Sequence, residues 1–197
     1  DPYIYFYEEF LQKFDKKERQ IRGAYYTPPP VVKYIISGIN EILKDNFDIH
    51  EGLADESITL LDFAVGTGTF LVEVFKQIFD ELKELNTPQA QIDNKIRNHI
   101  LQNFFGFEYM ISPFTISYLK LTRMIEDYGF KFTKQDCPKI YLTNTLEETK
   151  DPSNLFNLKG IEKHIRETMN VKTTKKIFVI TGNPPYLKSD KTTEHIK

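Results

Sequence analysis

Apolar residues recur along this chain at two spacings, and each spacing predicts a different kind of element. Apolar positions three or four residues apart predict amphipathic helices over residues 3–20, 31–42, 69–85 and 113–127. Short runs rich in β-branched and aromatic residues predict strands at 58–63, 104–107, 139–142 and 177–180. A more polar helix is expected over about 89–102. Strands that alternate with helices favour an α/β fold with a largely parallel sheet.

The pattern also suggests how the chain is organised. We expect N-terminal helices over residues 1–45 and a catalytic core over 46–197, with a polar insertion carrying one helix at about 147–174. The last predicted strand, 177–180, reads as buried. Because the chain begins without methionine and stops eleven positions after Tyr186, we expect it to be a piece of something longer, with a sheet that is incomplete at the C-terminus.

Composition narrows the class of protein. A chain of 197 residues with 40% hydrophobic and 27% charged residues can bury one sizeable core. No apolar run approaches the roughly 18 residues of a membrane span, and the first residues resemble no secretory signal, so we expect a cytoplasmic protein without a membrane partner. The lone Cys137 and four scattered histidines predict no metal site. A net charge of −2 gives no whole-chain argument for nucleic acid.

A glycine-rich turn follows the first predicted strand. Gly66, Thr67 and Gly68 lie between that strand and a helix, where glycines let the backbone approach a nucleotide-type cofactor closely. A tight connection without a ligand is the alternative. The dinucleotide fingerprint requires glycine or alanine where this chain has Leu71, which disfavours NAD.

Two carboxylates mark the ends of neighbouring predicted strands. Asp62 can contact a cofactor amine, or it can cap its own turn. Glu108 lies where a carboxylate accepts hydrogen bonds from both ribose hydroxyls, unless it is a surface acid. Tyr109 and Met110 can flank an adenine ring, and core packing accounts for them equally well.

The segment Gly182–Tyr186, with the sequence GNPPY, follows the last predicted strand. The side-chain oxygen of Asn183 and the main-chain carbonyl of Pro184 can each accept one hydrogen of a planar amine, which returns electron density to its nitrogen. Pro184 and Pro185 stiffen this arc before the substrate arrives. Tyr186 offers an aromatic face to a base. The alternative is a proline-rich strand exit with a surface tyrosine.

Four segments together resemble the adenine-N6 DNA methyltransferases of bacterial restriction–modification enzymes, specifically the single-polypeptide type I-like and type IIG relatives. They are GAYYTPPPVV at 23–32, LDFAVGTGTFL at 61–71, GFEYMISPFTISYLKL at 106–121 and TGNPPY at 181–186. The resemblance implies a Rossmann-like methyltransferase sheet with helices on both faces, preceded by an N-terminal helical segment.

The resemblance further implies that the cofactor is S-adenosylmethionine. Tyr26, Thr27 and Pro28 would close over its methionine end, above Gly66, Thr67, Gly68 and Phe70, while Glu108 would hold the ribose. Asn144 falls where the family usually has an acid near the cofactor's adenine. Phe63 replaces the usual proline after the aspartate.

By the same resemblance, the substrate is double-stranded DNA with an adenine flipped into a pocket at Asn183 and Tyr186, and a target recognition domain lies downstream. Three alternatives stay open: a methyltransferase that acts on protein glutamine or on RNA, a Rossmann oxidoreductase, and a fragment that binds the cofactor without turnover.

Overall fold

A sheet of four parallel strands forms the centre of the computed structural model, which describes residues 27–147 and 159–186. The strands are β1 (Leu60–Asp62), β2 (Phe104–Glu108), β3 (Lys139–Leu142) and β4 (Val179–Thr181). Their spatial order is β3-β2-β1-β4. The chain therefore moves outward in one direction from β1 to β3 and then returns to the other side of β1, which creates a switch point between β1 and β4.

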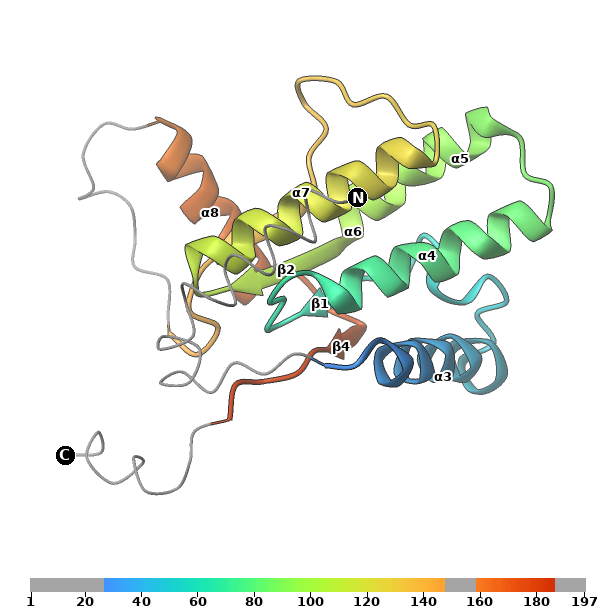
Figure 1. Cartoon of the computed structure of the whole chain (residues 1–197), viewed down its shortest axis with the longest axis horizontal. Coiled ribbons are helices and arrows are strands. Elements are labelled where there is room, and N and C mark those ends of the chain that lie inside the picture. Colours follow the sequence, from blue (N-terminus) through green and yellow to red (C-terminus); the bar gives the residue numbers. More distant parts are fainter. Residues whose placement is uncertain (1–26, 148–158, 187–197) are drawn as a thin grey trace.

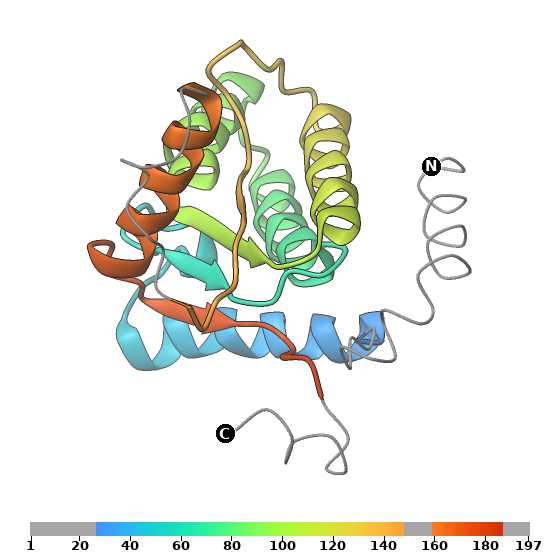
Figure 2. The same cartoon turned by 90° about the vertical axis from the view of Figure 1, so that its left-hand side faces the viewer.

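Helices cover both faces of this sheet, as Figures 1 and 2 show. The helices α4 (Thr69–Glu84) and α7 (Ile111–Asp127) lie on one face, and α3 (Pro29–Phe47) packs along α4. The helix α8 (Lys159–Thr173) lies on the opposite face. The predicted α/β fold with a parallel sheet is confirmed.

The main core forms because the predicted helical spacing puts apolar side chains on one face. In α4 the buried positions are Phe70, Leu71, Val74, Phe75, Ile78, Phe79 and Leu82. Polar contacts then fix α3 against α4. Asn40 is buried, its Oδ1 accepts the amide N–H of Leu53 at 2.8 Å, and its Nδ2 donates to Glu81 Oε1 at 2.6 Å.

Two helices begin earlier than their sequence pattern predicts. The helix α3 begins at Pro29 rather than near Val31, and α7 begins at Ile111 rather than at Pro113. Proline is tolerated in the first turn of a helix because the N–H that it lacks has no intrahelical partner there. A proline near a predicted start therefore marks the first turn rather than a boundary.

The polar segment predicted as one helix over 89–102 is helical throughout, but its hydrogen-bonding pattern changes along its length. It consists of α5 (Gln89–Lys95), a π-helical turn η2 (Ile96–Ile100) and the short α6 (Leu101–Asn103). A single 3-10 turn, η1 (Gly52–Ala54), precedes β1. The buried His99 in η2 contacts the main-chain oxygen of Leu53 through Nε2 at 3.0 Å, which ties these two irregular segments together.

The helix expected within residues 147–174 is the crossover between β3 and β4. Its Val171 packs with Phe105, Phe107 and Tyr141 in a second, smaller core cluster. The helix therefore covers the second face of the sheet. The proposed boundary between 1–45 and 46–197 stays a prediction, and the helix predicted over 3–20 lies outside the described residues.

The prediction that the last strand is buried is wrong. Phe178 is 49% exposed and Ile180 is 64% exposed, and the strand itself runs from Val179 to Thr181. The reason is position: in the part of the chain that the structure describes, β4 pairs with β1 alone and forms an edge of the sheet. Among residues 27–147 and 159–186, no helix is long and apolar enough to cross a membrane.

Candidate functional site

The segments predicted to carry chemistry meet at the carboxyl ends of β1 and β4. The glycine loop leaves β1 after Asp62, and the GNPPY segment leaves β4 after Thr181, two residues that are paired in the sheet. One depression is lined by both segments and by the residue that precedes α3: its lining is Thr27, Ala64, Val65, Gly66, Thr67, Thr69, Phe70 and Asn183. A switch point of a parallel sheet is where open α/β folds bind their ligands.

The two loop glycines are needed for different reasons. Gly66 has φ +56°, and a Cβ there would meet no atom within 4 Å, so its main chain borders open space. Gly68 has φ +86° and immediately precedes α4, and a Cβ there would lie 3.1 Å from Cβ of the buried Ser117. Gly66 therefore leaves room for a ligand, whereas Gly68 lets α4 pack closely against α7.

Asp62 is fully buried at the end of β1. Its Oδ1 accepts the amide N–H of Ala64 at 3.1 Å, which is the predicted cap of its own turn. Its Oδ2 has no hydrogen-bond partner among the described residues. Burial, with a smaller contribution from the nearby Glu108 carboxylate, raises the pKa of Asp62 to about 7. An unpartnered, buried carboxylate oxygen fits a cationic or hydrogen-donating ligand group.

Glu108 links the tip of β2 to the glycine loop. Its Oε2 accepts the amide N–H of Gly66 at 2.8 Å, and its Oε1 accepts that of Met110 at 2.8 Å. Burial raises the pKa of Glu108, and the backbone N–H groups of Met110, Gly66 and Tyr109 oppose this rise. Glu108 is buried, which excludes the surface-acid alternative. Each carboxylate oxygen has a further lone pair for a hydroxyl donor.

The loop after β3 crosses the end of β2 to reach the same region. The hydroxyl of Thr145 donates to the main-chain oxygen of Phe63 at 2.6 Å, and the N–H of Thr143 donates to the main-chain oxygen of Glu108 at 2.7 Å. Asn144 lies between them, with its Oδ1 accepting the N–H of Leu146 at 3.1 Å. Asn144, which is predicted to lie near the cofactor's adenine, is therefore flanked in sequence by two residues that contact the site.

The remaining predicted cofactor residues differ in exposure. Phe70 is buried and packs in the main core, Thr67 is also buried, and Tyr109 is 56% exposed just beyond β2. Pro28 lies at the start of α3 and accepts the N–H groups of Val31 and Val32 through its main-chain oxygen. Tyr26 lies outside the described residues.

The GNPPY segment places a polar side chain against the start of α3. The Nδ2 of Asn183 donates to Thr27 Oγ1 at 2.9 Å, although the two residues are 156 positions apart. Pro184, Pro185 and Tyr186 are exposed. The structure thus brings Asn183 together with Thr27 and the glycine loop, and it leaves the ring of Tyr186, 57% exposed, accessible to a partner.

Two glycines shape the site through close contacts that the sequence did not predict. A Cβ at Gly106, within β2, would lie 2.5 Å from Val65 Cγ2. A Cβ at Gly182, which has φ +140°, would lie 2.8 Å from Asp62 Oδ1 and 3.3 Å from the Phe63 ring. A glycine inside an apolar strand pattern was the available signal for Gly106, because it commonly marks a close approach of another segment.

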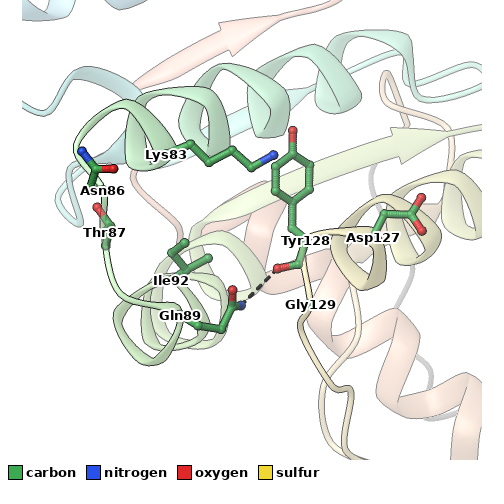
Figure 3. A pocket seen from close by; sticks show the side chains of 8 residues that line it. All are labelled: Lys83, Asn86, Thr87, Gln89, Ile92, Asp127, Tyr128 and Gly129. Atoms are coloured by element: carbon green, nitrogen blue, oxygen red, sulfur yellow. Dashed lines mark hydrogen bonds between the residues drawn. The ribbon is translucent and has the colours of Figure 1, made fainter.

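A second depression lies near the C-terminal ends of α4 and α7, and Figure 3 shows the residues that line it. It forms where α4 ends, α5 begins and α7 ends, with Gln89 Nε2 donating to the main-chain oxygen of Tyr128 at 3.0 Å. Lys83 Nζ lies 4.3 Å from the centre of the Tyr128 ring. This place is at the amino ends of the strands, away from the carboxylates and GNPPY. Within the described residues, no group of three or more histidine, cysteine, aspartate or glutamate side chains could hold a metal ion.

Comparison with known proteins agrees with this arrangement. A family model described as N-6 DNA methylase matches residues 4–197. The protein in a cryoEM structure of the DrdV–DNA complex is 26% identical, with a TM-score of 0.67, and the match covers 92% of this chain and 16% of that chain. No curated protein matches the chain.

Two further solved structures share the fold. A nuclease-deletion mutant of the type ISP restriction–modification enzyme LlaGI, in complex with a DNA substrate mimic, is 22% identical with a TM-score of 0.68. The ATP-dependent type ISP enzyme LlaBIII bound to DNA is 23% identical with a TM-score of 0.69. These matches cover 83% and 84% of this chain but 13% and 10% of those chains. The chain therefore spans only a small part of the solved proteins that it resembles.

Proposed function

The chain belongs to the N-6 DNA methylase family, and we propose that it carries the cofactor site and the catalytic segment of a site-specific adenine-N6 DNA methyltransferase in a restriction–modification system. The observation that carries this proposal is the meeting of two segments around one depression. Gly66 from the loop after β1 and Asn183 from the segment after β4 line the same hollow at the switch point.

The site residues fit S-adenosylmethionine by their chemistry. The open space at Gly66 admits a ligand next to the main chain, and the unpartnered Oδ2 of Asp62 suits the cofactor's cationic amine. Glu108 has lone pairs for the ribose hydroxyls, and Thr27 lies at the rim with Asn183. Two buried carboxylates favour a ligand with a positive charge, which S-adenosylmethionine has and NAD has only on its nicotinamide ring. When bound, this cofactor supplies an electrophilic methyl group.

The acceptors in GNPPY would prepare a poor nucleophile. Asn183 Oδ1 and the Pro184 main-chain oxygen would each accept one hydrogen of the adenine amine, which would draw the nitrogen lone pair out of the ring. Gly182 is wedged against Asp62 and Phe63, and two prolines follow Asn183, so the acceptors are held in place before the base arrives. Because these acceptors would orient the amine and hold its two hydrogens, the chain would not need a strong base to remove a proton before transfer.

The exposed Tyr186 would stack on the flipped adenine. The solved proteins that this chain resembles are much longer and are bound to DNA or a DNA mimic. We therefore propose duplex DNA as the partner. We also propose that a target recognition domain belongs to a region outside this chain, and that the protein acts on DNA in the cytoplasm.

Methylation of DNA tests the proposal directly. The chain is incubated with unmethylated DNA and methyl-labelled S-adenosylmethionine, and the digested nucleosides are separated by mass spectrometry. Labelled N6-methyladenine is expected with the wild-type chain and with Asn98→Ala, an exposed asparagine on η2. Asn183→Ala is expected to abolish transfer while cofactor binding persists. Label only in cytosine, or only in a glutamine-containing peptide or RNA offered in parallel, would contradict the assignment.

A further inference from the structure

The hydrogen bond between Asn183 and Thr27 decides which end of the Asn183 amide faces a substrate. A primary amide carries an acceptor oxygen and a donor NH₂ group, and rotation by half a turn exchanges the two. In this structure the NH₂ end is engaged, since Nδ2 donates to Thr27 Oγ1 at 2.9 Å. The carbonyl end, Oδ1, is then the end that remains for a ligand.

We propose that Thr27 is a positioning residue that holds Asn183 in its acceptor orientation, so that the site receives an amino group and rejects a carbonyl oxygen. This inference rests on the proposed function, and it adds a determinant of substrate class. The sequence suggested separate roles for the two residues, cofactor closure for Thr27 and catalysis for Asn183. The hydrogen bond between Asn183 and Thr27 makes the two residues act together.

Thr27 is well placed to hold an orientation because its backbone is fixed on one side. Pro28 follows it with φ −58° and ψ 135°, and Pro29 opens α3, so the residue before them is restricted to extended backbone. The helix α3 is in turn anchored to α4 through its buried face and through the contact of Asn40 Nδ2 with Glu81. A hydroxyl presented by such a support loses little entropy when it forms a bond.

Asn183 is fixed from the opposite side. Gly182 lies so close to β1 that any side chain would meet Asp62 Oδ1 and the Phe63 ring, and Thr181 is paired with Asp62 in the sheet. The amide is therefore carried by a short connection from a sheet strand and held at its tip by a helix-anchored hydroxyl. The threonine hydroxyl keeps its own proton, with which it can donate to a ligand in the same depression.

The amino-group preference follows from hydrogen-bond matching. An adenine amine donates two hydrogens, and an Asn183 amide turned the other way would point its own NH₂ at them. A donor that faces a donor leaves both groups without a hydrogen-bond partner. A base that presents a carbonyl oxygen would in turn meet Asn183 Oδ1, acceptor against acceptor.

Three variants test the inference. Thr27→Val removes the hydroxyl at nearly constant shape, and Thr27→Ser keeps it. Thr59→Val is the matched control, because the Thr59 hydroxyl also ties β1 to the chain entering β4: it donates to the main-chain oxygen of Lys176 at 2.7 Å and accepts the N–H of Phe178 at 2.9 Å. That tie lies at the amino end of the sheet, away from Asn183. Circular dichroism verifies that each variant is folded.

The first readout is the side-chain amide of Asn183, observed by NMR in the chain labelled with ¹⁵N-asparagine. We expect its NH₂ protons to exchange slowly and to be shifted in the wild type, in Thr27→Ser and in Thr59→Val. In Thr27→Val they should exchange fast and move to the position of a solvated amide. An Asn183 amide that is the same in Thr27→Val as in the wild type would overturn the inference.

The second readout is methyl transfer to DNA at saturating and limiting cofactor. Thr27→Val should lower kcat about tenfold at saturating S-adenosylmethionine, which corresponds to about 1.4 kcal/mol. Thr27→Ser should restore kcat. An effect confined to KM, or an equal loss in Thr59→Val, would contradict a positioning role. If the wild type forms no N6-methyladenine, the proposed function fails, and the amide measurement alone decides whether Thr27 orients Asn183.

Discussion

Replacing Asp62 with asparagine is expected to stabilise the free chain above neutral pH. The carboxyl group is fully buried, with one oxygen lacking a partner among the described residues, so its ionised form is poorly solvated in the folded state. The amide of the Asp62→Asn variant would keep an oxygen to accept the N–H of Ala64 and would carry no charge. The destabilising charge is thus removed without removing the turn cap.

The magnitude follows from the shift of the pKa. Burial raises the pKa of Asp62 from 3.8 to about 7. Between these two values the unfolded chain has released the proton and the folded chain has kept it, so the free energy of unfolding falls as pH rises, by about 1.4 kcal/mol per pH unit. The advantage of Asp62→Asn over the wild type should therefore grow by about 3 kcal/mol from pH 5 to pH 8, and level off above the folded pKa.

Urea denaturation at pH 5, 6, 7 and 8 without cofactor measures this advantage. The exposed Asp45→Asn controls for the loss of one carboxylate from the chain. An advantage of Asp62→Asn that is the same at all four pH values would show that Asp62 ionises alike in the folded and unfolded chains, contrary to a pKa raised by burial. The same variant should bind S-adenosylmethionine more weakly, since the site would lose a negative charge.

Three further substitutions test the packing around the site. Gly106→Ala would place a Cβ 2.5 Å from Val65 Cγ2, and we expect it to lower the free energy of unfolding by roughly 1–3 kcal/mol in urea denaturation and to weaken cofactor binding; unchanged values would mean that Val65 moves freely. Gly182→Ala, at φ +140°, should cost a similar ~1–3 kcal/mol and reduce methyl transfer more than cofactor affinity, as measured by kinetics and calorimetry. Val171→Ala removes buried methyl groups beside Phe105 and Phe107 and should cost roughly 1–3 kcal/mol; no loss of stability would show that α8 does not belong to the core.

Local periodicity correctly predicted the elements in which the apolar positions of the sequence are also the buried positions of the structure. The strand at residues 139–142 and the helix over 69–85 match β3 and α4 almost residue for residue, because their apolar spacing coincides with what is buried. The run at 177–180 predicted a strand but not its exposure. Whether an apolar strand is covered depends on its neighbours in the sheet, which no local pattern specifies.

The site was predicted in its parts and not in its connections. The glycine loop, Glu108 and the GNPPY segment were found because each follows a predicted strand, and parallel strands bring their carboxyl ends to one edge. The bond between Thr27 and Asn183 spans 156 positions and depends on where α3 starts. The close approach of Gly182 to Asp62 depends on the pairing of β4 with β1. Such contacts follow from the assembled sheet.

Isothermal titration calorimetry shows whether the glycine loop after β1 and Glu108 at the end of β2 bind S-adenosylmethionine. The wild-type chain is titrated with S-adenosylmethionine and, in parallel, with NAD, and Glu108→Ala is titrated in the same way. We expect one saturable site for S-adenosylmethionine alone, with affinity at least about tenfold lower in Glu108→Ala, which loses the acceptor of the Gly66 N–H and of the ribose hydroxyls. Binding of NAD with equal affinity, or S-adenosylmethionine binding that Glu108→Ala leaves unchanged, would show that the glycine loop and Glu108 do not form a site for S-adenosylmethionine.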